Sequence, residues 1–192
     1  MPSAYDDEIW SLVPEERSGP PPAVRRLVSE LGPVPRALDL GCGDGRTAEL
    51  LEAGDLVLVD VSDVALARAA KRLPGARAVL VEPDRALPLP DNAFELVLCT
   101  DTVEHVRDVS LLLSEARRVL VPGGRLALST PAHGRLTGLD VLVRGFERRF
   151  DPLSPHLRFF TRGSLGGLLG GFGFAVEEMG RDAGTLVAVA TR

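Results

Sequence analysis

Residues 39–45 read DLGCGDG, a glycine-rich turn that directly follows the strand-like run RALDL at residues 36–40. The next apolar run, DLVLVD at residues 55–60, ends in the acid Asp60. Glycine adopts positive φ angles readily and leaves the backbone bare, so a ligand can lie directly against it. A carboxylate that closes the neighbouring strand can accept hydrogen bonds from a ribose diol. The two strand ends therefore predict a site for a ligand that contains ribose.

Around this turn, short apolar runs alternate with runs of helical periodicity, which is typical of a parallel sheet with helices on both faces. We predict one doubly wound α/β domain, in which a turn around Gly180–Gly184 joins the last two strands. Glycines interrupt the apolar face of the last helix, which should therefore be weak or short. The expected strands are 36–40, 55–60, 77–82, 93–100, 125–130, 174–179 and 185–192, and the other expected helices are 22–32, 44–53, 62–73 and 109–120.

Composition narrows the class of protein. The 192 residues suit a single domain (1–192), and 45% hydrophobic with 26% charged residues is a globular composition. A net charge of −5 argues against a nucleic-acid partner, because non-specific affinity for phosphates comes from clustered basic residues. The N-terminal residues do not resemble a signal peptide, and the apolar runs are too short to cross a bilayer. We expect a cytoplasmic monomer or homodimer with no membrane partner.

Two other glycine-rich patterns are rivals for residues 39–45. A P-loop is excluded, because no Gly-Lys-Ser/Thr follows. The dinucleotide pattern Gly-x-Gly-x-x-Gly is closer, but its third glycine position holds Arg46. The acid Asp39 is also unfavourable beside a pyrophosphate, whereas it suits the ammonium group of an amino acid. A purely structural turn is the remaining alternative.

The segment LDLGCGDG resembles the glycine motif of class I S-adenosylmethionine-dependent methyltransferases, particularly the small-molecule group called type 11. The resemblance continues in LVLVDVS, LPLPDNAFELVLCTDTVEHV and LLLSEARRVLVPGGRLALSTP, in the family's order over residues 36–131. It implies a Rossmann-like sheet of seven strands, mostly parallel, that ends in an antiparallel hairpin. It also implies S-adenosylmethionine as cofactor. Asp39, Gly41 and Gly43 would hold the methionine part and Asp60 the ribose, with Cys42, Val61 and Thr100 completing the cofactor site.

The position that reads the adenine is left open by this sequence. Relatives usually carry an Asp a few residues before the Leu-Pro of the third loop, and here VEPDRALP places Pro83 there. Either Glu82 or Asp84 could replace that Asp.

The stretch CTDTVEHV at residues 99–106 bears on the methyl acceptor. A neutral hydroxyl must lose its proton, either to a base or with the help of a metal that lowers its pKa. We interpret His105 as a general base or a positioning group, with Asp101 and His156 as further catalytic candidates. The spacing also resembles a metal motif of ubiquinone-pathway quinol O-methyltransferases and small-RNA 2′-O-methyltransferases. We expect no metal; if a divalent metal is present, its ligands would be Asp101, Glu104, His105 and His156.

Two segments flank the cofactor half of the chain. Residues 1–35 form an N-terminal arm in which Tyr5 and Trp10 either close over the cofactor or pack on the domain. Residues 132–160 interrupt the strand–helix alternation and are expected to cover the acceptor as a lid. Some of its residues are expected to line the pocket for the methyl acceptor, or instead to pack on the core: Val141, Leu142, Arg144, Phe146, Arg148, Phe150 and Arg158.

We therefore predict transfer of a methyl group from S-adenosylmethionine to a small-molecule acceptor, at oxygen. The alternatives are an NAD(P)-dependent oxidoreductase and a protein that binds S-adenosylmethionine without catalysis.

Overall fold

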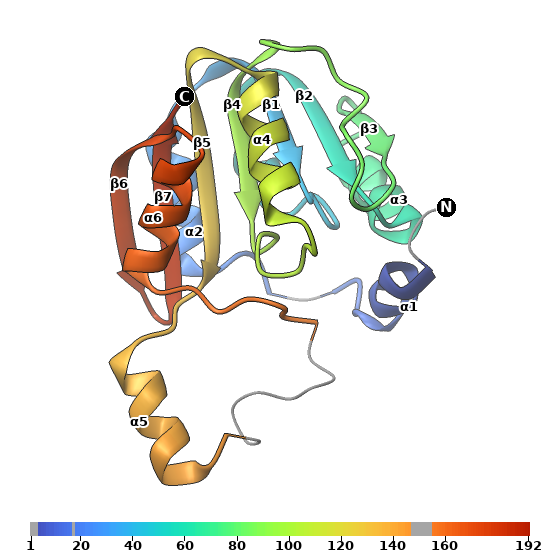
Figure 1. Ribbon diagram of the computed structural model, residues 1–192. Helices are drawn as coiled ribbons and strands as arrows, with labels where there is room; N and C mark the ends of the chain where they lie inside the picture. Colours follow the sequence, from blue (N-terminus) through green and yellow to red (C-terminus); the bar gives the residue numbers. More distant parts are fainter. Residues whose placement is uncertain (1–3, 17, 147–154) are drawn as a thin grey trace.

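A seven-stranded sheet in the order β3-β2-β1-β4-β5-β7-β6 forms the centre of the computed structural model, which describes residues 4–16, 18–146 and 155–192 (Figure 1). Strands β1 to β5 run parallel, while β7 is antiparallel to both β5 and β6. This confirms the predicted fold class. The strands are β1 (Val34–Leu40), β2 (Ala53–Asp60), β3 (Arg77–Leu80), β4 (Phe94–Thr100), β5 (Leu120–Pro131), β6 (Ala175–Asp182) and β7 (Thr185–Thr191).

Helices cover both faces of the sheet because successive residues of each central strand point to opposite sides. Leu38 of β1 belongs to the core under α4 (Val109–Val119) and α6 (Arg162–Gly171). Its neighbour Ala37 faces the other side, under α2 (Pro22–Leu31). Helix α3 (Asp63–Arg72) lies on that same side, over Leu58. Both faces of the sheet are therefore buried at β1 and β4.

The helix predicted over residues 44–53 is wrong. The structure has a single 3₁₀ turn, Ala48–Leu50, in that place. Strand β2 already begins at Ala53, which pairs with Val34, so too few residues remain for a helix of ordinary length. Gly45 also has a φ of +77° and lies so close to α3 that an added Cβ would be 3.3 Å from Ala69.

The C-terminal hairpin forms as predicted, with a tighter turn. Ala183 and Gly184 both have positive φ, which is typical of a two-residue hairpin connection. The glycine-containing helix α6 is ten residues long. Thr161 caps its N-terminus by accepting from the Ser164 N–H at 3.1 Å, and Leu165 and Leu169 are fully buried. Burial of these two leucines offsets the low helix propensity of the glycines.

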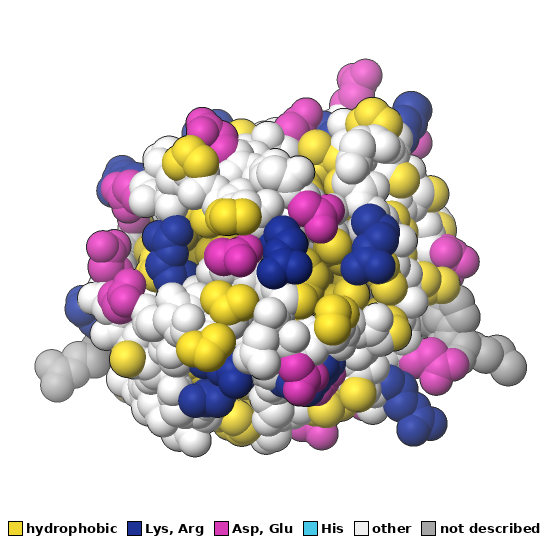
Figure 2. Space-filling view, turned by 90° about the horizontal axis from the view of Figure 1, so that it is seen from above, with side chains coloured by type: hydrophobic (Ala, Val, Ile, Leu, Met, Phe, Trp, Pro, Cys, Tyr) yellow, Lys and Arg dark blue, Asp and Glu magenta, His cyan; other side chains and the backbone are white. Residues whose placement is uncertain are grey.

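Two helices lie outside the layers, at the end of the sheet to which the parallel strands point: α1 (Ala4–Leu12) beside α3, and α5 (Arg135–Arg144) below β5 (Figure 1). The opposite end of the molecule carries basic and acidic side chains mixed together, without a large area of one sign (Figure 2). Among the described residues, no helix is long and apolar enough to cross a membrane.

Candidate functional site

The glycine turn lies at the carboxyl ends of β1 and β2, as predicted. Gly41 has a φ of +79° and donates its N–H to the Val59 carbonyl at 2.8 Å. A Cβ added to Gly41 would lie 2.4 Å from the Thr102 side chain, so no other residue fits there without movement. The Gly43 N–H donates to the Asp60 carboxylate at 2.8 Å, and this bond ties the turn to the acid that closes β2.

Asp39 is a buried carboxyl group without a hydrogen-bond partner. It is 1% exposed, and neither of its side-chain oxygens has a partner among the described residues. Its register neighbours on β2 and β4 are the apolar Leu58 and Leu98. Burial, followed by repulsion from Asp60, raises the pKa of Asp39 to about 8. A ligand ammonium group would supply both the missing hydrogen bonds and a compensating charge. The residues present therefore fit the methionine end of S-adenosylmethionine.

Asp60 closes β2 with both carboxylate oxygens bound to backbone N–H groups. One carboxylate oxygen accepts from Gly43 N and the other from the Ser62 N–H at 3.0 Å. Each oxygen has a second lone pair, so both can also accept from a ribose hydroxyl. Burial raises the pKa of Asp60, while the two backbone N–H groups favour its charged form.

The other three predicted cofactor residues, Cys42, Val61 and Thr100, lie in different surroundings. The Cys42 side chain packs with Leu58, Leu66 and Ala69 in the core under α3, and its Sγ lies 3.5 Å from the Gly43 carbonyl oxygen. Val61 is half-buried beside Asp60. Thr100 closes β4, and its carbonyl accepts from the Thr102 hydroxyl at 3.0 Å. Thr102 packs against Gly41 and is a residue that the sequence analysis missed; it lies within a motif that was already identified.

Glu82 and Asp84, the two adenine candidates, are both exposed. Asp84 pairs with Arg107 at 2.8 Å, which places it against the loop after β4. Glu82 lies 3.8 Å from Arg85 within its own loop. Asp84 therefore contacts a second element of the cofactor end.

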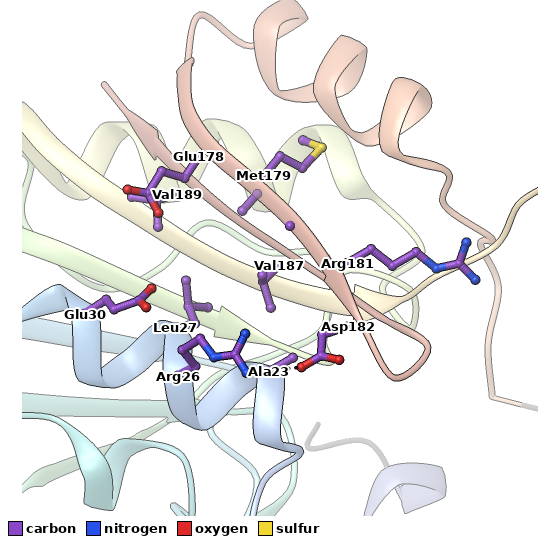
Figure 3. Close-up of a pocket in the computed structure, with 12 residues that line it drawn as sticks. Ala23, Arg26, Leu27, Glu30, Glu178, Met179, Arg181, Asp182, Val187 and Val189 are labelled. Carbon is purple, nitrogen blue, oxygen red and sulfur yellow. Dashed lines mark ion pairs between the residues drawn. The ribbon is translucent and has the colours of Figure 1, made fainter.

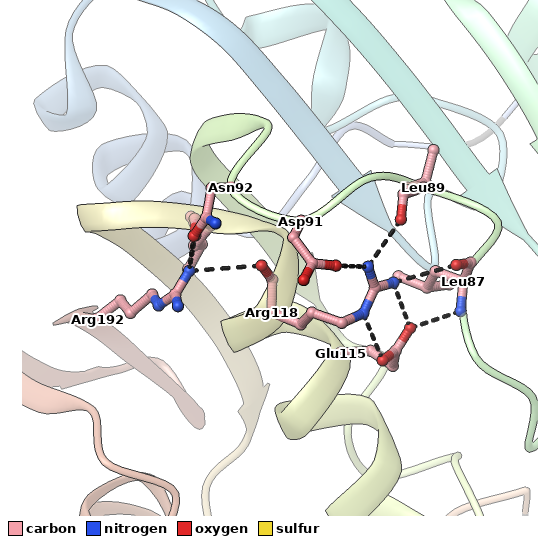
Figure 4. Close-up of polar contacts among 8 residues, drawn as sticks. Leu87, Leu89, Asp91, Asn92, Glu115, Arg118 and Arg192 are labelled. Atoms are coloured by element: carbon pink, nitrogen blue, oxygen red, sulfur yellow. Dashed lines mark hydrogen bonds and ion pairs between the residues drawn. The ribbon is translucent and has the colours of Figure 1, made fainter.

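The loop that follows these acids is held from α4 by Arg118 and Glu115 (Figure 4). Arg118 donates to the carbonyls of Leu87 and Leu89, while Glu115 accepts from the Leu87 N–H at 2.6 Å. Arg118 also pairs with Glu115 at 2.7 Å, which holds the pKa of Glu115 below its usual value. These contacts position residues 87–91, and the sequence gives no periodic signal for them.

Three residues that were predicted as catalytic groups or as metal ligands lie together beyond β4: Glu104, His105 and His156. One potential ligand atom of each lies within 4.8 Å of the others. The two imidazole rings meet edge to face, with centroids 4.8 Å apart. His156 lies 50 or more positions after Glu104 and His105 in the chain. The Glu104 carbonyl accepts from the N–H groups of Leu157 and Arg158, and these hydrogen bonds hold the segment of His156 against the site.

Glu104 and His105 have opposite pKa shifts. Glu104 is 1% exposed; its Oε2 accepts from the Thr130 hydroxyl at 3.0 Å, and its Oε1 has no hydrogen-bond partner among the described residues. Burial raises the pKa of Glu104 to about 7. Burial lowers the pKa of His105, whose Nδ1 lies 3.1 Å from the Pro155 carbonyl. Because a carbonyl can only accept, Nδ1 carries the proton, and Nε2 faces Glu104 Oε1 at 3.9 Å as an acceptor.

Asp101 does not join this group. Its carboxylate accepts from the Ser129 hydroxyl at 2.9 Å, and its N–H is bound to Ser129 as well. The structure therefore brings together three of the four predicted metal ligands. One carboxylate and two imidazoles suit a divalent ion such as Mn²⁺ or Zn²⁺. His133 lies apart from the three, with its ring against Phe159 at 5.0 Å.

The predicted lid is described only in part. Arg148 and Phe150 lie outside the described residues. The side chains of Leu142 in α5 and of Phe146 just after it are exposed, and Arg144 pairs with Asp140 at 3.3 Å. Arg158 donates to the carbonyls of Val106 and Arg107, so it is already engaged. A separate pocket of about 390 Å³ lies between α2 and the β6–β7 hairpin, away from the predicted site residues (Figure 3).

Comparisons with known proteins agree with this geometry. A family model described as a methyltransferase domain matches residues 38–128. The trans-aconitate 2-methyltransferase of Acidovorax ebreus is 34% identical over 66% of this chain and 50% of that protein. The ubiquinone/menaquinone biosynthesis C-methyltransferase of Methylobacterium nodulans is 30% identical over 73% of this chain and 66% of that protein. The chain covers between 32% and 52% of the length of four other curated proteins that it matches.

Solved structures show the same fold. The S-adenosylmethionine-dependent methyltransferase of Mesorhizobium loti superposes with a TM-score of 0.65 at 26% identity, over 89% of this chain and 96% of that one. The [4+2]-cyclase SpnF has a TM-score of 0.72 at 19% identity, over 88% of this chain and 80% of that one. Since a cyclase has this fold too, the fold alone does not define the reaction. The motifs, the strand order and the matches to named methyltransferases agree, and the chain belongs to the class I S-adenosylmethionine-dependent methyltransferases.

Proposed function

We propose that this chain transfers the methyl group of S-adenosylmethionine to an oxygen atom of a small-molecule acceptor. The observation that carries the proposal is a neutral His105 imidazole, with Nε2 as acceptor, beside the buried Glu104 at the end of β4. Methyl transfer from a sulfonium needs alignment of the acceptor with the methyl group more than covalent help. A hydroxyl acceptor also needs a base, and a neutral imidazole with a free Nε2 supplies one.

Glu104 and His156 act on His105 in this proposal. The pKa of Glu104 is raised to about 7, so its carboxylate can accept from His105 the proton that His105 removes from the acceptor hydroxyl. The hydrogen bond from Nδ1 to the Pro155 carbonyl holds the ring with Nε2 on the side of Glu104. His156 packs edge to face against the His105 ring.

The names of the relatives support methyl transfer without naming one acceptor atom. One is a malonyl-[acyl-carrier protein] O-methyltransferase and another a C-methyltransferase. The histidine and glutamate at the mouth favour oxygen, because a base is needed to ionise a hydroxyl acceptor.

The same three side chains offer a second way to activate the acceptor. A divalent ion bound by Glu104, His105 and His156 would lower the pKa of a coordinated hydroxyl, and His105 would then be a ligand instead of a base. Protein treated with EDTA distinguishes the two. Full activity after treatment supports His105 as the base, whereas loss of activity that Mn²⁺ restores assigns the three residues to a metal.

We further infer that residues 132–160 cover the acceptor. Two observations support this: the end of the segment is bound to the Glu104 carbonyl, and α5 exposes Leu139, Leu142 and Val143 beside the site's end of the sheet. Exposed apolar side chains of this kind are suited to cover an apolar acceptor.

Binding and turnover test the proposed function directly. In isothermal titration, S-adenosylhomocysteine should bind at micromolar concentrations and NAD should not bind; the reverse result would assign the chain to the oxidoreductases. A panel of hydroxylated and carboxylated small molecules should then reveal consumption of S-adenosylmethionine. If the cofactor binds but no acceptor of any class is methylated, the chain is a binding protein without catalysis.

A further inference from the structure

The N-terminal helix α1 is attached to the elements that frame the cofactor site. It lies beside α3 at the end of the sheet where β1 and β2 finish (Figure 1). Asp7 Oδ1 accepts from the Ser62 hydroxyl at 2.6 Å and from the Val64 N–H at 3.3 Å. Beyond the helix, the Val13 carbonyl accepts from Arg68 of α3 at 2.8 Å. The arm is thus bound to the start and to the middle of α3.

The bond from Asp7 leads directly to the ribose acid. Ser62 donates its hydroxyl to Asp7 Oδ1 and its backbone N–H to Asp60 Oδ1 at 3.0 Å. The other oxygen of Asp60 accepts from Gly43 N at 2.8 Å. One continuous chain of hydrogen bonds therefore joins the arm, the acid that closes β2 and the glycine turn. The hydrogen bond from Ser62 lowers the pKa of Asp7, so Asp7 is charged near neutral pH.

Trp10 of α1 lies against the bare backbone of Gly43. A Cβ built on Gly43 would lie 2.6 Å from Trp10 Cζ2 and 2.8 Å from Cη2, so the six-membered ring of the indole occupies the space that a side chain would take. Gly43 is a glycine of the turn that the cofactor is expected to contact. The indole is therefore placed to form one wall of that site.

Helix α1 is held by these contacts more than by a core of its own. None of its nine residues is fully buried, and Tyr5 and Leu12 are 56% and 79% exposed. A helix of this length is marginal in water unless tertiary contacts stabilise it. A segment that is bound by a few polar contacts and one aromatic ring can detach at low cost, as a cover over an exchanging ligand must.

We propose that α1 is a cover of the cofactor site, in which Trp10 forms a wall beside Gly43 and the Asp7–Ser62 contact holds the arm closed. Asp7 is a positioning residue that acts through Ser62, and Trp10 is a residue of the binding site. The cofactor enters and leaves when the arm detaches, so the strength of the Asp7 contact sets the exchange rate. This inference rests on S-adenosylmethionine binding at the glycine turn, and does not depend on the acceptor.

The chain offers a direct probe, because Trp10 is its single tryptophan. In the 192-residue chain, saturating S-adenosylhomocysteine should change the intensity or wavelength of tryptophan emission. Stopped-flow displacement then gives the dissociation rate. Asp7→Ala should raise that rate by about fivefold, the effect expected when one partly exposed charge-assisted hydrogen bond is lost. Glu8→Ala is the matched control, since it removes a negative charge from the exposed side of the same helix.

Trp10 is tested by calorimetry, because its replacement removes the fluorophore. Trp10→Ala should weaken S-adenosylhomocysteine binding by about tenfold, and Trp10→Phe should restore most of the loss. Unchanged emission in the wild-type protein, or dissociation constants in Trp10→Ala equal to the wild type, would overturn the proposal. So would a dissociation rate of Asp7→Ala equal to that of Glu8→Ala. If the wild-type protein binds no S-adenosylhomocysteine, the proposed function and the cover both fail; if it binds without involving Trp10, only the cover fails.

Discussion

The cofactor end of β1 and β2 and the acceptor group beyond β4 both contain a buried carboxyl with a raised pKa, but their surroundings differ. Asp39 has apolar neighbours in register and no hydrogen-bond partner among the described residues. Glu104 has the Thr130 hydroxyl and two imidazoles beside it. The first arrangement is suited to a cationic ligand, which would supply the missing charge. The second is suited to moving a proton. The comparison predicts that changes in the two regions affect different steps.

The largest effect is expected at His105. His105→Ala should lower kcat by about 10² to 10⁴, the range that a positioned general base contributes, because the acceptor hydroxyl would keep its proton. S-Adenosylhomocysteine affinity should not change, since the imidazole lies outside the cofactor contacts. The measurement is kcat for a methylated acceptor beside calorimetry with S-adenosylhomocysteine. His133→Ala, whose ring packs on Phe159, serves as the control. A parallel loss of cofactor affinity would show that the two regions are not separate.

Asp39→Asn should produce the opposite pattern. Loss of a buried charge pair should weaken S-adenosylhomocysteine by about 100-fold, or about 3 kcal/mol. Because Asp39 has a pKa of about 8 when free and must be ionised beside an ammonium group, wild-type binding at pH 7 should also release a proton. Calorimetry in two buffers of different ionisation enthalpy measures this release. If wild type and Asp39→Asn release equal numbers of protons, Asp39 is not the residue that meets the cofactor charge.

Asp60→Ala should have a smaller effect on the same equilibrium. We expect more than tenfold weaker binding, about 1.4 kcal/mol, if charge-assisted ribose contacts are lost. Asp55→Ala, at the exposed start of the same strand, is the control for removal of an acid from β2. An unchanged dissociation constant for Asp60→Ala would contradict the placement of the ribose at this strand end.

Asp39 should also affect the stability of the free protein. Asp39 has a folded pKa of about 8, above the value of 3.8 for an exposed Asp, so folding takes up a proton between these values. The contribution of Asp39 to stability is full below about pH 3.8 and is lost as pH rises toward 8. Asp39→Asn, which cannot ionise, should therefore melt higher than wild type at pH 7 to 8, by about 2–4 °C for each kcal/mol. The difference should shrink toward pH 4. Thermal melts across this range decide, and equal melting curves at pH 8 would mean that Asp39 is not desolvated.

Local sequence predicted most of the cofactor end. Residues 39–62 contain the turn, the strand and the cap, and glycine at positions 41 and 43 follows from backbone geometry that other residues rarely adopt. The same reasoning failed at residues 44–53, where helical composition predicted a helix. Strand β2 begins at Ala53, which pairs with Val34, and this leaves too few residues for a helix. Pairing partners that are distant in the chain are not visible in a local window.

The acceptor group depended more on tertiary structure. The motif named Asp101, Glu104, His105 and His156 together, yet Ser129 of the neighbouring strand draws Asp101 away. Thr130, which supports Glu104, and Arg118, which holds the loop before β4, stood out in no pattern. Their roles arise from contacts across strands and helices.

The sequence by itself determined the alternation of strands and helices, the bare turn at residues 41–45 and the acids near the ends of β1 and β2, because each follows from properties of neighbouring residues. Only the tertiary structure decided which carboxyl groups are buried away from water and lack hydrogen-bond partners. It also decided that His156 meets His105, and that Trp10 lies on Gly43. Burial and proximity between distant segments are properties of the packed chain, and they set the charge states on which the chemistry depends.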